Sequence, residues 1–277
     1  MHITGTNVHI SASSSAWFHA NGQEYYDGKG YYGGKLKPMF AMIEVKNSTL
    51  TGLKVLNTPA HAFMIGESYY SDFINFEVDD SFGDVNVIAK NTDGIHILQS
   101  SNIRIVGAKI HNQDDCVCIT SGCDVKITSI TCIGGGFSVG SIGKNRLNTV
   151  ERVIFGQSTL THGLYGLLIK AWAGTKGTVD QITFENIVLK DVRQQGIAIT
   201  QGYTNAGLYS KPIKGVSITN VFMKNIRGNV LEKGQNIMIN CAPGGCGNFY
   251  WDNVNIVGGE RILMRNASAP TELHNGH

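Results

Sequence analysis

A six-residue pattern that recurs along the chain constrains the fold more than any other feature. The pattern is apolar-x-polar-apolar-x-apolar, and its third residue is always Gly, Asn, Ser or Gln. Its eight copies begin at residues 50, 73, 105, 127, 155, 184, 218 and 251, so successive starts are 23, 32, 22, 28, 29, 34 and 33 residues apart. Periods of about 20–50 residues are typical of solenoids and repeat arrays.

The copies have the character of short strands joined by a bend. The final apolar-x-apolar has strand period, and the small polar residue before it suits the bend between two strands. A β-sandwich would space its strands about 8–12 residues apart, and no capped helical pattern lies between the copies. One such turn is too small to bury its own face, so neighbouring turns must stack. We therefore predict an all-β, single-stranded, right-handed parallel β-helix.

The sequence also predicts the number of domains and whether the chain is a fragment. We expect residues 1–277 to form a single β-helix domain. The first residues, Met1-His2-Ile3-Thr4-Gly5, have neither the charged start nor the apolar stretch of a signal peptide. We expect a fragment truncated at its N-terminus, and truncation at the C-terminus is left open.

Charge and hydropathy exclude two classes of partner. The net charge is +2 over 277 residues, so the chain lacks the basic footprint of a nucleic-acid-binding protein. The sequence contains no run of about 18 apolar residues that would span a membrane.

The cysteines predict an oxidising compartment. Their even number, six, fits disulfides, and the absence of Cys-x-x-Cys pairs predicts no metal site. The glycosylation sequons Asn47-Ser48-Thr49 and Asn266-Ala267-Ser268 agree with secretion. We expect a secreted, extracellular glycoprotein.

Two acidic clusters lie between the repeats: Asn91-Thr92-Asp93-Gly94 and Gln113-Asp114-Asp115-Cys116. Asp93 and Asp115 are 22 residues apart, which is one turn of the predicted helix, so the clusters should lie side by side. Carboxylates gathered on one surface repel one another, so one can stay protonated while another stays ionised. Hydrolysis of a glycosidic bond needs that pair of states. Either cluster alone is also a common turn sequence, so their register is what favours a site.

With these clusters the chain resembles the polygalacturonases, a family of pectin-hydrolysing glycoside hydrolases. Asn-Thr-Asp-Gly followed one turn later by Gln-Asp-Asp-Cys is a specific signature of that family, and so is Gly140-Ser141-Ile142-Gly143. The likeness runs from Gly22-Gln23-Glu24-Tyr25-Tyr26-Asp27-Gly28 and Lys37-Pro38 through Cys246-Gly247-Asn248. It implies a pectin-lyase-like solenoid that hydrolyses α-1,4-galacturonosyl linkages by an inverting acid/base mechanism, without a cofactor.

The resemblance also implies roles for individual residues. Asp114 is expected to be the general acid, with Asp93 and Asp115 activating the water. The expected substrate-binding residues are Asn91, Lys170 and Tyr203. The expected disulfides are Cys116 with Cys132 and Cys241 with Cys246, which leaves Cys118 and Cys123 without a counterpart.

Two departures from the family pattern predict a weakened site. Where the family has Gly-His-Gly-x-Ser, this chain reads Gly134-Gly135-Gly136-Phe137-Ser138 after Cys132-Ile133, and the histidine is missing. Where the family has Arg-Ile-Lys, this chain has Leu168-Ile169-Lys170. Leucine cannot supply the planar fork of an arginine, a loss of about 1.5–3 kcal/mol. We expect none of the possible replacements to restore the histidine, and these are His96, His111 and His162.

Three functions therefore compete. The first is a polygalacturonase acting on polygalacturonate or a related pectin. The second is an inactive relative that binds pectin fragments or serves as a decoy for plant polygalacturonase-inhibiting proteins. The third, a pectate lyase, is disfavoured because the acidic signature is that of the hydrolases. We expect a monomer with pectic polysaccharide and plant inhibitor proteins as its partners.

Overall fold

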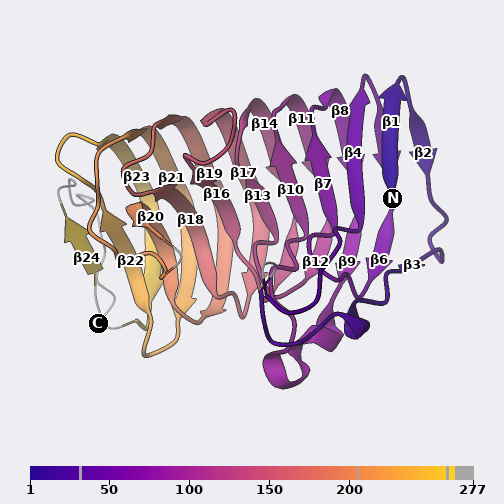
Figure 1. Cartoon of the computed structure of the whole chain (residues 1–277). Helices are drawn as coiled ribbons and strands as arrows, with labels where there is room; N and C mark the ends of the chain where they lie inside the picture. The colour runs from indigo at the N-terminus through magenta and orange to yellow at the C-terminus, as the bar shows by residue number, and fades with distance from the viewer. Residues whose placement is uncertain (31–32, 205, 260–261, 266–277) are drawn as a thin grey trace.

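The computed structural model describes residues 1–30, 33–204, 206–259 and 262–265. The chain coils into a solenoid in which all strand pairs between turns are parallel, with the N-terminus at one end and the C-terminus at the other (Figure 1). Each turn contributes strands to three sheets, which we call the first, second and third sheet. The prediction of a parallel β-helix is confirmed.

The first sheet carries the residues that matter most below. Its strands, in order of pairing, are β1 (His2–Thr6), β4 (Ala41–Lys46), β7 (Phe63–Gly66), β10 (Ile95–Leu98), β13 (Val117–Ile119), β16 (Phe137–Ile142), β18 (Tyr165–Trp172), β20 (Gln195–Tyr203), β22 (Gln235–Asn240) and β24 (Ile262–Arg265).

The other two sheets merge towards the C-terminal end. The second sheet begins with β2 (His9–Ser11), β5 (Thr49–Thr51), β8 (Tyr69–Ile74), β11 (Ser100–Val106) and β14 (Gly122–Thr128). The third begins with β3 (Phe18–His19), β6 (Lys54–Leu56), β9 (Glu77–Asp79), β12 (Lys109–His111) and β15 (Thr131–Ile133). The later turns supply both sheets with one bent strand each: β17 (Thr149–Thr161), β19 (Gly177–Val192), β21 (Val216–Val230) and β23 (Cys246–Val257).

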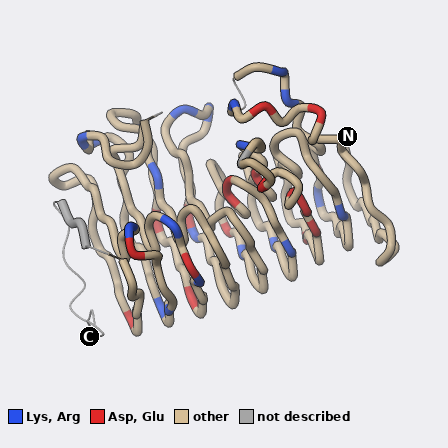
Figure 2. Tube along the Cα trace, turned by 90° about the horizontal axis from the view of Figure 1, so that it is seen from below, with Lys and Arg blue, Asp and Glu red and all other residues tan. Residues whose placement is uncertain are grey.

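Two short 3-10 helices, η1 (Gly22–Glu24) and η2 (Ser81–Val87), lie in the connections that follow β3 and β9. Among the described residues no helix is long and apolar enough to span a bilayer. Acidic and basic side chains are interspersed along the length of the solenoid (Figure 2).

The polar third position of the repeat marks the corner between the second and third sheets. All eight of these residues have a left-handed backbone: Gly52, Asn75, Gly107, Ser129, Gln157, Asn186, Asn220 and Asn253. Asn and Gly tolerate positive φ better than other residues. The prediction that this residue makes the bend is therefore confirmed.

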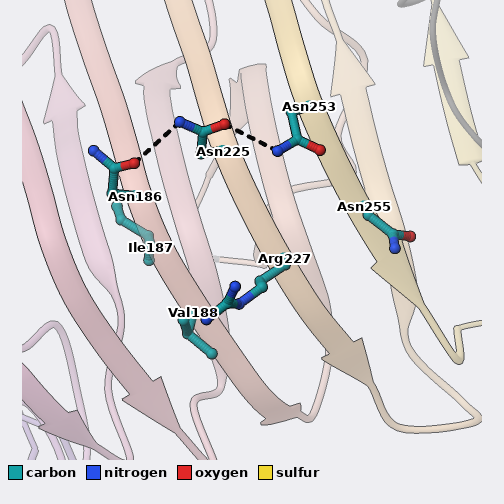
Figure 3. Close-up of a pocket in the computed structure, with 7 residues that line it drawn as sticks. All are labelled: Asn186, Ile187, Val188, Asn225, Arg227, Asn253 and Asn255. Atoms are coloured by element: carbon teal, nitrogen blue, oxygen red, sulfur yellow. Dashed lines mark hydrogen bonds between the residues drawn. The ribbon is translucent and has the colours of Figure 1, made fainter.

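The seventh copy was assigned to the wrong corner. Strand pairing aligns Asn186 with Asn225 and then with Asn253, whereas Asn220 aligns with Gln181 and Asn248 at an earlier bend within the second sheet. Asn225 Nδ2 donates to Asn186 Oδ1 (3.1 Å), and Asn253 Nδ2 donates to Asn225 Oδ1 (2.9 Å) (Figure 3). The copy around Asn225 ends on glycine (Gly228) instead of an apolar residue, which breaks the pattern.

Aliphatic ladders fill the interior of the solenoid. One runs through the first sheet in register and is fully buried: Ile43, Ile65, Ile97, Ile119, Val139, Ile169, Ile199 and Ile239. Burial of each such side chain stabilises the fold by about 1.5–3 kcal/mol. Because successive residues of a strand face opposite sides, the residues between them point outward. We call one outward ladder the outer row: Met64, His96, Cys118, Ser138, Leu168, Ala198 and Met238.

Candidate active site

The two acidic clusters meet at the entry to adjacent strands of the first sheet. Asp93 lies two residues before β10, and Asp115 lies two residues before β13, the next strand of the sheet. Carboxylate oxygens of Asp93, Asp114 and Asp115 lie within 4.8 Å of one another. The one-turn register inferred from the sequence therefore brings the three carboxylates together.

Neighbouring polar residues hold the two clusters in register. Asn112 is fully buried, and its Nδ2 donates to the carbonyls of Thr92 (2.7 Å) and Asp115 (2.9 Å). Thr92 Oγ1 donates to Gln113 Oε1 (2.8 Å) and accepts from the Gln113 N–H (3.0 Å). Each buried amide bonded on both sides is costly to disrupt, so the spacing of the carboxylates is built into the backbone.

Asp115 is bonded at both carboxylate oxygens. Lys170 Nζ lies 2.9 Å from Oδ2 in a salt bridge, and the Ser138 hydroxyl donates to Oδ1 at 2.5 Å. The Asp115 side chain is 7% exposed and that of Lys170 is 12% exposed. Burial raises the pKa of Asp115, and the charge of Lys170 opposes that rise. This carboxyl is therefore the member of the cluster with a dedicated cation.

Asp114 has a different environment. Asn91 Nδ2 donates to its Oδ2 at 3.0 Å, and the Asp115 N–H donates to its Oδ1 at 2.8 Å. Burial, with the charges of Asp93 and Asp115, raises the pKa of Asp114 to about 8. A carboxyl with such a pKa holds its proton at neutral pH. Asp114 and Asp115 thus have the divergent surroundings that separate an acid from a base.

Lys170 and Tyr203 lie together beyond the carboxylates. The Lys170 Nζ is 5.6 Å from the centroid of the Tyr203 ring, which packs at 4.6 Å against Trp172. Lys144 Nζ lies over the other aromatic ring of this group, 3.3 Å from the Trp172 centroid. Burial raises the pKa of Tyr203, so its phenol stays neutral. Lys144 and Trp172 were not among the residues expected from the sequence.

The histidines around the site differ from expectation. His96 lies in the outer row beside the cluster, and burial lowers its pKa to about 4. His111 is paired with Asp84 (2.7 Å), and His162 is well exposed. His61, which the sequence reasoning missed, has Nε2 3.5 Å from Asp93 Oδ1. It lies two residues before β7, the same offset that Asp93 has before β10, and that shared offset is the signal that would have identified it.

The two departures from the family pattern fall in tightly packed places. A Cβ on Gly135 would lie 1.9 Å from the Asp114 carbonyl oxygen, and one on Gly136 would lie 2.6 Å from the Tyr165 carbonyl oxygen. Leu168 is fully buried in an apolar cluster with Ala198, Leu208 and Met238, against which Tyr165 and Tyr203 pack. The chain therefore fills this position with packed hydrocarbon and does not leave an open pocket where the arginine is expected.

Two disulfides have the pairings that the resemblance implies, Cys116–Cys132 and Cys241–Cys246. The first joins the residue after Asp115 to β15, the last strand of the turn that begins with β13. Cys118 and Cys123 are free thiols. Of the two sequons, Asn47 is exposed at a left-handed corner, and Asn266 lies outside the described residues.

Comparisons with known proteins agree with this arrangement. The family model described as glycosyl hydrolases family 28 matches residues 1–272. A polygalacturonase of Cochliobolus carbonum is 41% identical over 261 residues, which cover 94% of this chain and 71% of that protein. A probable endopolygalacturonase of Neosartorya fischeri is 40% identical over 265 residues, with 94% and 70% covered.

Solved structures give the same result. Endopolygalacturonase I from Stereum purpureum, solved with two galacturonates, superimposes with a TM-score of 0.89 at 28% identity, covering 96% of this chain and 80% of that one. The endo-xylogalacturonan hydrolase of Aspergillus tubingensis, at 18% identity and a TM-score of 0.79, shares the fold over 99% of this chain and 78% of its own.

Proposed function

The chain belongs to glycosyl hydrolases family 28, and from that membership we propose that it hydrolyses the α-1,4-galacturonosyl linkages of polygalacturonate with Asp93, Asp114 and Asp115 as its catalytic residues. The observation that carries the assignment is the contrast between Asp114 and Asp115. One carboxyl has a pKa near 8, while its neighbour is held by a buried lysine 2.9 Å away.

In the proposed reaction Asp114 protonates the glycosidic oxygen as the bond to the anomeric carbon breaks. A water attacks that carbon, and Asp115 or Asp93 takes a proton from the water. One chain leaves with a new hydroxyl and the other carries the reducing end. The proton on the base returns through solvent to Asp114 before the next turnover.

The assignment of Asp115 as a base, and not as a nucleophile, rests on its bonds. Ser138 and Lys170 occupy its two oxygens, which disfavours attack on carbon, so we propose inversion at the anomeric carbon. The carboxylate oxygens lie within 4.8 Å, closer than the about 6.5–9.5 Å usual for inverting enzymes. Proton NMR of the first product decides the point, since inversion yields the β-anomer and retention the α-anomer.

Substrate contacts are proposed for three polar residues beside the carboxylates: Asn91, Lys170 and Tyr203. Lys170 is proposed to serve two anions, Asp115 and a galacturonate carboxylate, because its Nζ lies between Asp115 and the Tyr203 ring. A polyanionic substrate matches the cations Lys144 and Lys170 near this aromatic group.

The test is release of reducing ends from polygalacturonate by the wild-type chain. Asp114→Asn removes the acid with little change of shape, and we expect it to abolish release while leaving oligogalacturonide binding intact. Asn225→Gly, on the far corner of the solenoid, is the matched control and should retain activity. Equal release by wild type and Asp114→Asn would refute the assignment.

A second candidate, a binder with little or no turnover, is favoured by one observation. Leu168 is fully buried in the cluster with Leu208, so it makes no charged contact of the kind that an arginine would make with a galacturonate carboxylate. Tight oligogalacturonide binding without products in the wild type would identify this function.

We further propose a secreted monomer that plant polygalacturonase-inhibiting proteins recognise. Two disulfides and the exposed sequon at Asn47 support secretion. Size-exclusion chromatography of the chain alone and with such an inhibitor tests both statements.

A further inference from the structure

A second cluster of side chains adjoins the carboxylates on the outer row. A carboxylate oxygen of Asp93, a ring nitrogen of His96 and the sulfur of Cys118 lie within 4.8 Å of one another. His96 and Cys118 are neighbours on the paired strands β10 and β13, and the Cys118 thiol donates to Asp93 Oδ2 at 3.5 Å. Imidazole, thiolate and carboxylate are the ligands that Zn²⁺ binds in proteins.

One nitrogen of His96 is left without a partner. Its Nε2 lies 2.9 Å from Thr120 Oγ1. Its Nδ1 is buried and, among the residues that the structure describes, makes no hydrogen bond. With the hydrogen on Nε2 donated to Thr120, Nδ1 presents a lone pair that nothing occupies. A histidine that binds a metal through one nitrogen commonly donates its other N–H to an oxygen in this way.

His61 stands beside the same carboxylate. Its Nε2 is 3.5 Å from Asp93 Oδ1, and its ring centroid is 5.6 Å from that of His96. Its nitrogen is not among the donor atoms that lie within 4.8 Å of one another, so His61 is placed to orient Asp93 and not to bind the same metal ion. Three carboxylates lie close together beside Lys170 in this region. Their negative charge favours the binding of a cation.

We propose that Asp93, His96 and Cys118 form a Zn²⁺ site that shares Asp93 with the catalytic cluster and leaves the fourth position of the tetrahedron to water. Zinc bonds of about 2.0–2.3 Å put tetrahedral donors roughly 3.3–3.8 Å apart. The Cys118 Sγ–Asp93 Oδ2 pair, at 3.5 Å, already has this spacing. On binding, the Cys118 thiol releases its proton to solvent, and its hydrogen bond to Asp93 is replaced by bonds from both groups to the metal, with no change of oxidation state.

Occupancy of this site has a consequence for catalysis. A zinc-bound Asp93 is no longer able to accept a proton from the attacking water. Zinc should therefore inhibit hydrolysis reversibly. The inhibition rests on the proposed hydrolase function, whereas the metal site itself does not.

Cobalt reports the site directly, because Co²⁺ takes up zinc sites and its bond to a thiolate gives a charge-transfer band. We expect the metal-free full chain titrated with Co²⁺ to develop that band with one equivalent, and Zn²⁺ to abolish it. Ca²⁺, which prefers oxygen ligands, should leave the band unchanged. Cys118→Ala should remove the band, whereas Cys123→Ala, which removes the other free thiol, should keep it.

A finer variant tests the geometry. Thr120→Val removes the oxygen that orients His96, and we expect it to weaken cobalt affinity about 10–100-fold, the usual effect of an outer partner. The proposal is wrong if the wild type shows no thiolate band, or if Cys118→Ala binds cobalt as tightly as the wild type. Polygalacturonate hydrolysis, with each protein compared to its own metal-free rate, should be inhibited by Zn²⁺ in the wild type and at least ~10-fold less sensitively in Cys118→Ala. A band in a protein that never hydrolyses polygalacturonate would uphold the site and refute the function.

Discussion

Asp114 shows how a single residue acquires its chemistry from its surroundings. The side chain itself is an ordinary carboxyl, but burial and two neighbouring carboxylates raise its pKa to about 8. Its proton is therefore retained in the pH range where an isolated aspartate has lost its own. The sequence could supply the cluster through the one-turn spacing, but not the hydrogen bonds that separate Asp114 from Asp115. These come from Asn91 in the connection before β10, Ser138 on β16 and Lys170 on β18.

The pH profile should report this pKa. We expect kcat/KM on polygalacturonate to fall as the pH rises through about 8, because the general acid is then deprotonated. Folding stability declines over a lower pH range, from about 4 up to about 8, because over that range the native state holds a proton that the unfolded chain has released. Asp93→Asn removes one of the negative neighbours and should lower the pKa of Asp114, followed by carbon-13 NMR of its carboxyl because Asp93 is itself assigned to catalysis. An unchanged pKa of Asp114 in this variant would contradict the account of Asp114.

The surroundings of Leu168 change the interpretation of the missing arginine. The sequence indicated that an arginine had been lost, and the structure adds that leucine is packed at 0% exposure. Sequence could not reveal this, because the covering residue Leu208 lies 40 positions away in a loop.

Restoring the arginine should therefore cost stability. We expect Leu168→Arg to lower the free energy of unfolding by about 3–5 kcal/mol, because it leaves a buried charge without a partner. Leu168→Met, which conserves volume, should cost less than about 1.5 kcal/mol. Urea titrations followed by circular dichroism measure both. A stable Leu168→Arg chain with raised activity would show that the Leu208 loop opens readily.

At the scale of elements, the corners decide how the strands are joined. The polar third residue of the repeat has a left-handed backbone in every copy, and this was visible in the sequence. The seventh copy was placed wrongly because β21 contains two polar residues with a left-handed backbone, Asn220 and Asn225. Only strand pairing shows that Asn225 continues the ladder from Asn186, because the copy around Asn225 breaks the apolar pattern at Gly228 and the copy around Asn220 keeps it. The proposed zinc ligands also become neighbours only through strand pairing, since Cys118 is separated from His96 by one turn.

Asn225 is a test of the corner. Asn225→Gly keeps the left-handed backbone but loses two side-chain hydrogen bonds, each worth about 0.5–1.5 kcal/mol. Asn225→Ala loses the same bonds and adds about 1–2 kcal/mol for a Cβ in this conformation. We expect chemical denaturation to rank wild type above Gly and Gly above Ala. The reverse order of the two variants would show that the backbone conformation contributes little here.

At the scale of the whole molecule, contacts between neighbouring turns stabilise the fold. Repeat proteins are stabilised mainly by contacts between adjacent units, so parts of the solenoid can open separately. The disulfide Cys116–Cys132 fastens the residue after Asp115, at the entry to β13, to β15 at the end of the same turn, whereas Cys241–Cys246 closes a short loop far along the chain. The repeat period was enough to predict this architecture, but not the lengths of the loops or the merging of the second and third sheets.

These two crosslinks should differ in effect. We expect replacement of Cys116 and Cys132 by serine to cost about 2–5 kcal/mol and to abolish hydrolysis at lower denaturant concentrations than those that remove β-structure. The matched pair, Cys241→Ser with Cys246→Ser, should keep the two transitions closer together. Activity and circular dichroism measured on the same urea series would reveal the difference. Coincident transitions in the first variant would mean that the solenoid unfolds as one unit.

The alignment of successive turns provides a test of whether a protein preparation has folded correctly. Asp93, Asp115, Ser138 and Lys170 come from the turns of β10, β13, β16 and β18, four in succession. A chain whose strands paired one residue out of register would be as compact and as rich in strand as the native one. Circular dichroism would not distinguish the two. The misregistered chain would nevertheless separate Asp115 from its lysine. Turnover is therefore an assay of folding fidelity, one that distinguishes a correctly registered batch from a merely soluble one.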